Sequence, residues 1–259
     1  MLIFGIRMRR IEMKAFRVLL KNELKMSIRG MDMLIFALIM SIVVLVILGI
    51  IFGQKPAFEG AGYSFLDQSF GAVSTIAICA GGVMGLPLVI SDYRSKHILK
   101  RYQVTPVSPV VVLLAEVSMY VIYAVVSLLS LLAVAVCFFD FKMHGSAGLF
   151  LVGYLLVMIS MFSIGMMVGG IAKNSKIAGI IASLLYFPML LFSGATLPYE
   201  VMPDLMQKTV NVLPLTQGIK ILKNATLGLP ADNVTGAIIF MLVTAVVCSI
   251  VSIKFFKWE

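Results

Sequence analysis

Few side chains in the apolar parts of this sequence could do acid, base or nucleophilic chemistry. Glu116 is the only ionised residue embedded in an apolar stretch, and the two histidines, His97 and His144, lie far apart in the chain. An enzyme working inside a membrane would need clustered Asp, Glu, His or Ser side chains. We therefore predict no catalytic residues. We interpret Glu116 as a side chain that snorkels or pairs with a nearby loop, in preference to a proton relay.

Phosphate chemistry is not indicated either. ATP hydrolysis normally uses a GxxxxGK[ST] loop around the phosphates, and the sequence has none. Gly165 and Gly169 instead form a GxxxG pair in an apolar run, which is typical of close helix packing. The three cysteines fall in apolar runs without metal-ligand spacing: Cys79, Cys137 and Cys248. We expect no enzyme activity, no bound metal and no cofactor on this chain.

The elements that carry these residues are apolar runs. Apolar residues make up 61% of the sequence and charged residues only 13%, whereas a globular domain has about a quarter charged. A membrane span needs roughly 20 apolar residues, and its backbone polar groups must be satisfied within the segment. The sequence thus predicts an all-α polytopic protein with a cytoplasmic region over 1–32 and a transmembrane domain over 33–256. Six spans are predicted, at about 33–53, 69–90, 110–139, 146–172, 177–196 and 234–254.

The basic residues predict the orientation. If the N-terminus is cytoplasmic, the inside segments hold 16 of the 21 Lys and Arg. The positive-inside rule favours this arrangement, so both termini are expected in the cytoplasm. The net charge of +9 is then a topology and anionic-lipid signal, and no nucleic-acid partner is expected.

Two segments outside the spans have structure-forming patterns. The stretch 15–29 puts apolar residues on one arc of a helix and Arg17, Lys21, Lys25 and Arg29 opposite, which predicts an amphipathic interfacial helix. Glu23 falls inside the apolar arc. Either its side chain snorkels or pairs with a neighbouring base, or it contacts a partner protein. The outer segment 198–232 is apolar but interrupted by prolines, which predicts one or two re-entrant or interfacial helices.

The cytoplasmic loop between the second and third spans is polar and basic. It has the length for a short helix over Tyr93 to Tyr102, which Thr105-Pro106 would end. On such a helix Ile98, Leu99 and Tyr102 would cluster on one side and suit docking into an apolar cleft. The alternative is a solvated basic loop that only sets topology.

These features resemble the type-2 ABC transporter permeases, the exporters of drugs, antibiotics, lipids and surface polysaccharides. The resemblance covers nearly all of the chain after Met13 and lies in the order of its motifs around the spans. The motifs are Glu23 and Arg29 on the amphipathic helix, Gln103-Val104-Thr105-Pro106-Val107-Ser108-Pro109, Phe192-Ser193-Gly194-Ala195, Leu197-Pro198, Met202-Pro203, and Leu213-Pro214-Leu215-Thr216.

The resemblance implies a dimer of six-span permeases, each seated on a separate ATPase subunit that holds ATP and Mg. The amphipathic helix and the first cytoplasmic loop would touch that ATPase. Relatives commonly carry acids before the Thr-Pro, whereas here only Asp92 remains, so the coupling surface is expected to be unusually basic. The predicted ATPase-coupling residues are Glu23, Arg29, Asp92, Arg94, His97, Ile98, Leu99, Arg101 and Tyr102.

An exporter subunit in a bacterial cytoplasmic membrane is thus the favoured function, with a homodimeric or heterodimeric second permease and membrane lipid as further partners. We favour a hydrophobic or amphipathic small molecule as substrate, such as a drug, antibiotic or lipid. A polysaccharide or teichoic-acid-type polymer is the alternative, and a non-transporting channel or scaffold is the other class considered. A channel would ordinarily have a ring of polar residues, which the runs lack. The candidate substrate-path residues are Phe36, Met40, Ser74, Tyr186, Met189 and Phe192.

Overall fold

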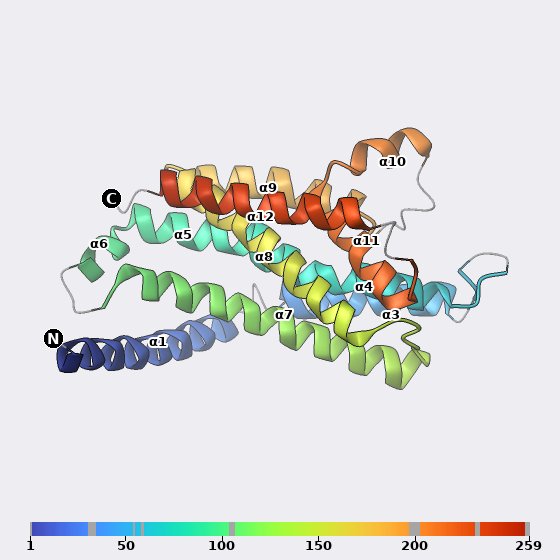
Figure 1. Ribbon diagram of the computed structural model, residues 1–259, viewed down its shortest axis with the longest axis horizontal. Coiled ribbons are helices and arrows are strands. Elements are labelled where there is room, and N and C mark those ends of the chain that lie inside the picture. Colours follow the sequence, from blue (N-terminus) through green and yellow to red (C-terminus); the bar gives the residue numbers. More distant parts are fainter. Residues whose placement is uncertain are drawn as a thin grey trace.

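The computed structural model describes residues 2–30, 35–53, 55–57, 60–103, 107–196, 203–230 and 234–256, and their side chains except at 2–11, 35–36, 99, 101, 103 and 204–205. These residues are almost entirely helical, as the all-α prediction requires (Figure 1). The elements are α1 (Leu2–Gly30), η1 (Ile35–Ile39), α3 (Met40–Phe52), α4 (Phe65–Cys79), η2 (Ala80–Gly85), α5 (Leu86–Ser95), α6 (Ile98–Gln103), α7 (Pro109–Phe139), α8 (Ala147–Ile171), α9 (Ser175–Phe192), α10 (Asp204–Val210), α11 (Pro214–Leu227) and α12 (Thr235–Phe255).

Five helical segments in the described residues are long and apolar enough to cross a membrane. They are Phe65–Ser95, which joins α4, η2 and α5, and the helices α7, α8, α9 and α12. The first predicted span is the short apolar helix Ala37–Phe52. At about 1.5 Å per residue it reaches only about 24 Å, against about 30 Å of hydrocarbon.

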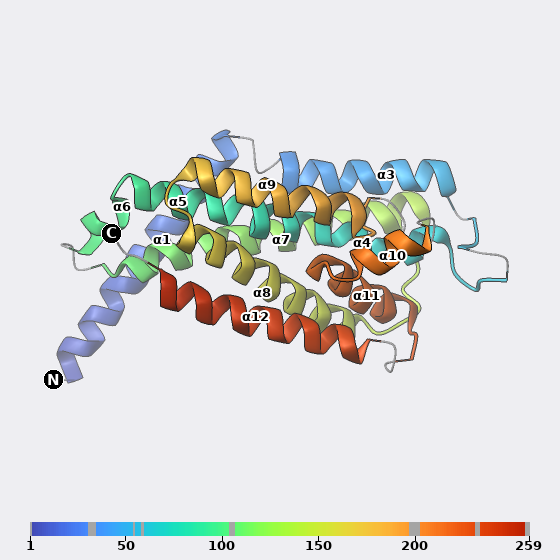
Figure 2. The same cartoon turned by 90° about the horizontal axis from the view of Figure 1, so that it is seen from above.

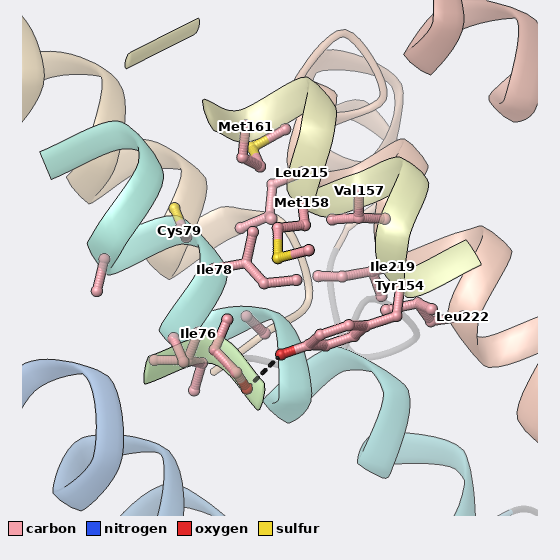
Figure 3. Packing of buried hydrophobic residues seen from close by; sticks show 14 of the residues in the cluster. Ile76, Ile78, Cys79, Tyr154, Val157, Met158, Met161, Leu215, Ile219 and Leu222 are labelled. Carbon is pink, nitrogen blue, oxygen red and sulfur yellow. Dashed lines mark hydrogen bonds between the residues drawn. The ribbon is translucent and has the colours of Figure 1, made fainter. Parts of the chain in front are cut away.

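The segment Phe65–Ser95 is the centre of the bundle (Figure 2). Its apolar window is 83% buried, against 28% for α9 and for α12, so the other helices surround it. Figure 3 shows this packing: Ile76, Ile78 and Cys79 of α4 face Tyr154, Val157, Met158 and Met161 of α8 and Leu215, Ile219 and Leu222 of α11. The Tyr154 hydroxyl donates to the Ala124 carbonyl at 2.8 Å, which joins α8 to α7.

Glycines let α8 approach this central segment closely. A Cβ added at Gly165 would lie 1.9 Å from the Gly82 carbonyl oxygen, and one at Gly169 would lie 2.9 Å from the Ile90 Cβ. Only a residue without a Cβ fits at such a distance. The predicted packing role of the Gly165–Gly169 pair is therefore confirmed.

The segment between α9 and α12 contains two helices in its described part. α10 is short, whereas α11 places Leu215, Ile219 and Leu222 in the core against α4 and α8. Figure 1 shows α11 beside the half of the bundle that holds α3 and α4, away from α6. The apolar side of α11 thus packs inside the bundle, whereas Val212 before it is 70% exposed.

The predicted single helix from Tyr93 to Tyr102 is wrong. α5 ends at Ser95, and α6 begins at Ile98 after a turn in which His97 has φ of 54°. The Lys96 amide donates to the Asp92 carbonyl and the His97 amide to the Arg94 carbonyl, which closes the end of α5. A left-handed residue after a helix usually is glycine, so His97 gave no sequence signal for the break. The predicted stop at Thr105-Pro106 lies outside the described residues.

Candidate functional site

The predicted coupling residues lie on α1 and on the stretch from the end of α5 through α6. The N-terminal part of α1, helix α6 and the C-terminal end of α12 share one end of the bundle (Figure 1), and α1 packs against α7, which it crosses at a steep angle (Figure 2). Inward-facing positions recur along α1 at Phe16, Leu19, Leu20, Glu23 and Leu24, whereas Arg17, Lys21, Lys25 and Arg29 are exposed. Helix α1 therefore presents its basic side away from the bundle.

Glu23, Tyr93 and Glu116 meet where α1, α5 and α7 converge. The Tyr93 Oη lies 2.8 Å from Glu23 Oε1 and 2.6 Å from Glu116 Oε1. Glu116 is 1% exposed, and its Oε2 has no hydrogen-bond partner among the described residues. The Glu23 carboxylate therefore points toward Tyr93, which explains its place in the apolar arc. Glu116 pairs with the end of α5, in line with the loop-pairing interpretation.

Arg94 binds the end of a neighbouring span. Its Nη1 donates to the carbonyl oxygens of Gly169 at 3.2 Å and Ala172 at 3.1 Å, and also to that of Gly170. Carbonyls at a helix C-terminus lack partners within the helix, and a cation is favourable there. Arg94 thus joins α5 to the end of α8.

Asp92 makes two further links at this end. Its Oδ2 accepts from Lys96 Nζ at 2.7 Å, and Ser175 Oγ donates to its Oδ1 at 3.3 Å. Because Ser175 begins α9, Asp92 fixes the start of that helix to α5. The end of α5 is therefore held to α8 by Arg94 and to α9 by Asp92.

Helix α6 presents a mixed surface. Tyr102 and Ile98 are partly buried, and Tyr102 packs against the core. Lys96, His97 and Lys100 are exposed around them. The side chains of Leu99 and Arg101 lie outside the described residues. Whether this surface docks on a partner stays a prediction.

The six candidate substrate-path residues do not share one environment. Ser74, Tyr186 and Met189 are buried in the core, with Ser74 Oγ donating to the Gly71 carbonyl. Met40 and Phe192 are exposed to 36% and 38% on the outside of the bundle. The side chain of Phe36 lies outside the described residues. The burial of Ser74 and Met189 reflects packing inside the chain, and their proposed role in a path stays a prediction.

Tyr93 is the residue that sequence reasoning missed. It belonged to a basic loop, and nothing in its spacing marked it as the link between two carboxyl groups. Glu23 in an apolar arc and Glu116 in an apolar run were the available signals, since a buried acid requires a partner.

Several apolar helices of membrane-spanning length around a buried central segment define a polytopic α-helical membrane protein. Residues 14–227 match the family described as ABC-2 type transporter, so the chain belongs to that family.

The chain is similar to curated proteins over part of its length. It is 30% identical to the inner membrane transport permease YhhJ of Escherichia coli K12 over 129 residues, which is 49% of this chain and 34% of YhhJ. It is 32% identical to nodulation protein J of Neorhizobium galegae over 73 residues, 28% of each chain. The chain thus spans about a third of the length of the first of these relatives.

Proposed function

We propose that this chain is the transmembrane subunit of an ATP-driven exporter that moves a hydrophobic or amphipathic small molecule outward across the cytoplasmic membrane. A separate ATPase subunit would bind ATP and Mg. Membership in the family supports a transport permease. The sequence has no phosphate-binding loop, which supports ATP hydrolysis by a separate subunit.

The observation that carries the proposal is that hydrogen bonds attach the end of α5 to two neighbouring helices. Arg94 and Asp92 attach this end to α8 and α9, and the exposed residues Lys96, His97 and Lys100 follow it directly. A partner that pushed on α6 would thereby displace three helices together. Such a contact transmits the closing motion of an ATPase into the bundle.

The orientation and assembly form part of the same proposal. The basic residues favour a cytoplasmic location for α6 and both termini. Ala37–Phe52, together with Ile35 and Phe36 of η1, would form a sixth span, and α11 would be a re-entrant helix on the outer side. A second permease copy would complete the transport path at the interface.

The proposal is tested by copurifying a tagged chain with its ATPase and measuring ATP hydrolysis. The double variant Leu99→Ala with Tyr102→Ala is expected to lose stimulation of the ATPase, because truncating interface anchors costs about 2 kcal/mol or more. Tyr102 also packs against the core, so the single variant Leu99→Ala, checked by membrane insertion and a melting curve, separates lost docking from lost packing. Parental stimulation and export by both variants would show that α6 is not the coupling contact.

A further inference from the structure

A cavity of about 430 Å³ lies between α1, α5, α7 and the start of α9. Tyr93, Tyr120, Met26 and Met119 contribute much of its wall, together with Leu88 and Val89 of α5. The charged side chains among its described lining residues are all acidic: Glu23, Asp92 and Glu116. The cavity therefore combines an apolar, aromatic wall with negative charge.

The acidic lining of this cavity contrasts with the basic net charge of the chain. The sequence has 21 Lys and Arg but only 12 Asp and Glu, so three acids around one cavity are not what the overall charge predicts. Asp92 has partners in Lys96 and Ser175. The unbalanced charge lies on Glu23 and Glu116.

Among the described residues, these two carboxyl groups share one hydrogen-bond donor, a tyrosine hydroxyl, and it cannot serve both. Tyr93 has one hydroxyl hydrogen, so it can donate to Glu23 or to Glu116 but not to both at once. Glu116 also keeps an unpartnered Oε2 although it is 1% exposed. A buried carboxyl in this position is either neutralised by a proton or paired with a cation.

We infer that this cavity is a binding site for an organic monocation, with its positive group beside the carboxyl groups of Glu23 and Glu116. Tyr93 and Tyr120 line the cavity, and aromatic rings attract cations, while Met26 and Met119 add polarizable surface for its apolar part. The apolar remainder of the wall favours an alkyl or aryl ammonium over a hydrated metal ion. That this cation is the exported cargo rests on the proposed function, whereas its binding does not.

Equilibrium dialysis of the purified chain in detergent tests the inference without any ATPase. The probe is radiolabelled benzyltrimethylammonium, whose charge does not change with pH. Its neutral isostere is neopentylbenzene, in which carbon replaces the nitrogen. We expect saturable binding of the probe, and no displacement of it by an equal concentration of the isostere.

Charge-removing variants locate the site. Glu116→Gln and Glu23→Gln are each expected to weaken probe binding by about tenfold or more, because each removes a carboxylate beside the positive group. Asp140→Asn is the matched control. It removes the same charge from an exposed residue of φ 50°, a conformation that Asn tolerates, and is expected to bind like the parent. Gel filtration and a melting curve establish that each variant is folded.

Three results would each overturn the inferred cation site. Parental affinity in both Gln variants, equal binding of the neutral isostere, or displacement of the probe by sodium alone would overturn the inference. If Glu116→Gln does not fold, Glu23→Gln on the half-buried face of α1 decides the question with the isostere competition. Binding without ATP-driven transport would contradict the proposed function and leave this site in place.

Discussion

Replacing Arg94 by methionine should weaken the attachment of the α5 end to α8. The Arg94 Nη1 has two hydrogens and three acceptor carbonyls, at Gly169, Gly170 and Ala172, so it makes at most two full hydrogen bonds at a time. Charge-assisted bonds contribute about 1.5–3 kcal/mol each. Water can replace part of this at a half-exposed residue, so we expect a loss of about 2–3 kcal/mol.

That loss would shift the equilibrium between the attached and detached α5–α6 connection by about 30- to 150-fold. The expected result is a permease that inserts and binds its ATPase but no longer stimulates it. The assay is ATP hydrolysis by the copurified complex in lipid.

Lys173→Met is the matched control, since it removes one exposed positive charge just after α8. If Arg94→Met and Lys173→Met stimulate the ATPase equally, with equal melting temperatures, then Arg94 does not transmit the coupling motion.

Three further predictions concern packing, activity and topology. Gly165→Ala should destabilise the chain by at least about 2 kcal/mol, because the added Cβ would meet the Gly82 carbonyl oxygen. Gly148→Ala on the same helix is the control and should leave the stability unchanged. Melting curves compare the two variants, and equal stability would refute the close packing. The purified chain without its ATPase should not hydrolyse ATP; transporter-like rates, with contaminating ATPase excluded by mass spectrometry, would contradict this. A single cysteine at Asp204, in a background lacking the native three, should react with an impermeant reagent in intact cells, and labelling only after the membrane is opened would reverse the orientation.

Hydrophobicity alone predicted the helical class and most of the helices, because a long charge-free run has few alternatives to a membrane helix. The central position of Phe65–Ser95 was not predicted. Its mean hydropathy of 2.1 is lower than the 2.7 of α7 and the 2.6 of α12, so hydropathy does not mark it as the buried segment. Only the packing of the chain determines which of them lies inside.

The site was less predictable than the fold. The link between Glu23 and Glu116 joins residues far apart in sequence through Tyr93, and no local pattern encodes such a contact. The turn at His97 uses a backbone conformation that glycine usually marks, so helical periodicity extended wrongly across it. Arg94 was predicted as an ATPase-coupling residue, and its hydrogen bonds to the carbonyls at the end of α8 had no local sequence signal.

The most direct test of the exporter proposal uses inside-out membrane vesicles that contain this chain with or without its partner ATPase. The measurement is the uptake of a panel of radiolabelled hydrophobic drugs after addition of ATP or a non-hydrolysable analogue. The account predicts concentrative uptake of at least one compound only when both subunits and hydrolysable ATP are present. Uptake through this chain that needs neither ATP nor the ATPase, and that stops at equal concentrations, would indicate a channel and contradict the account.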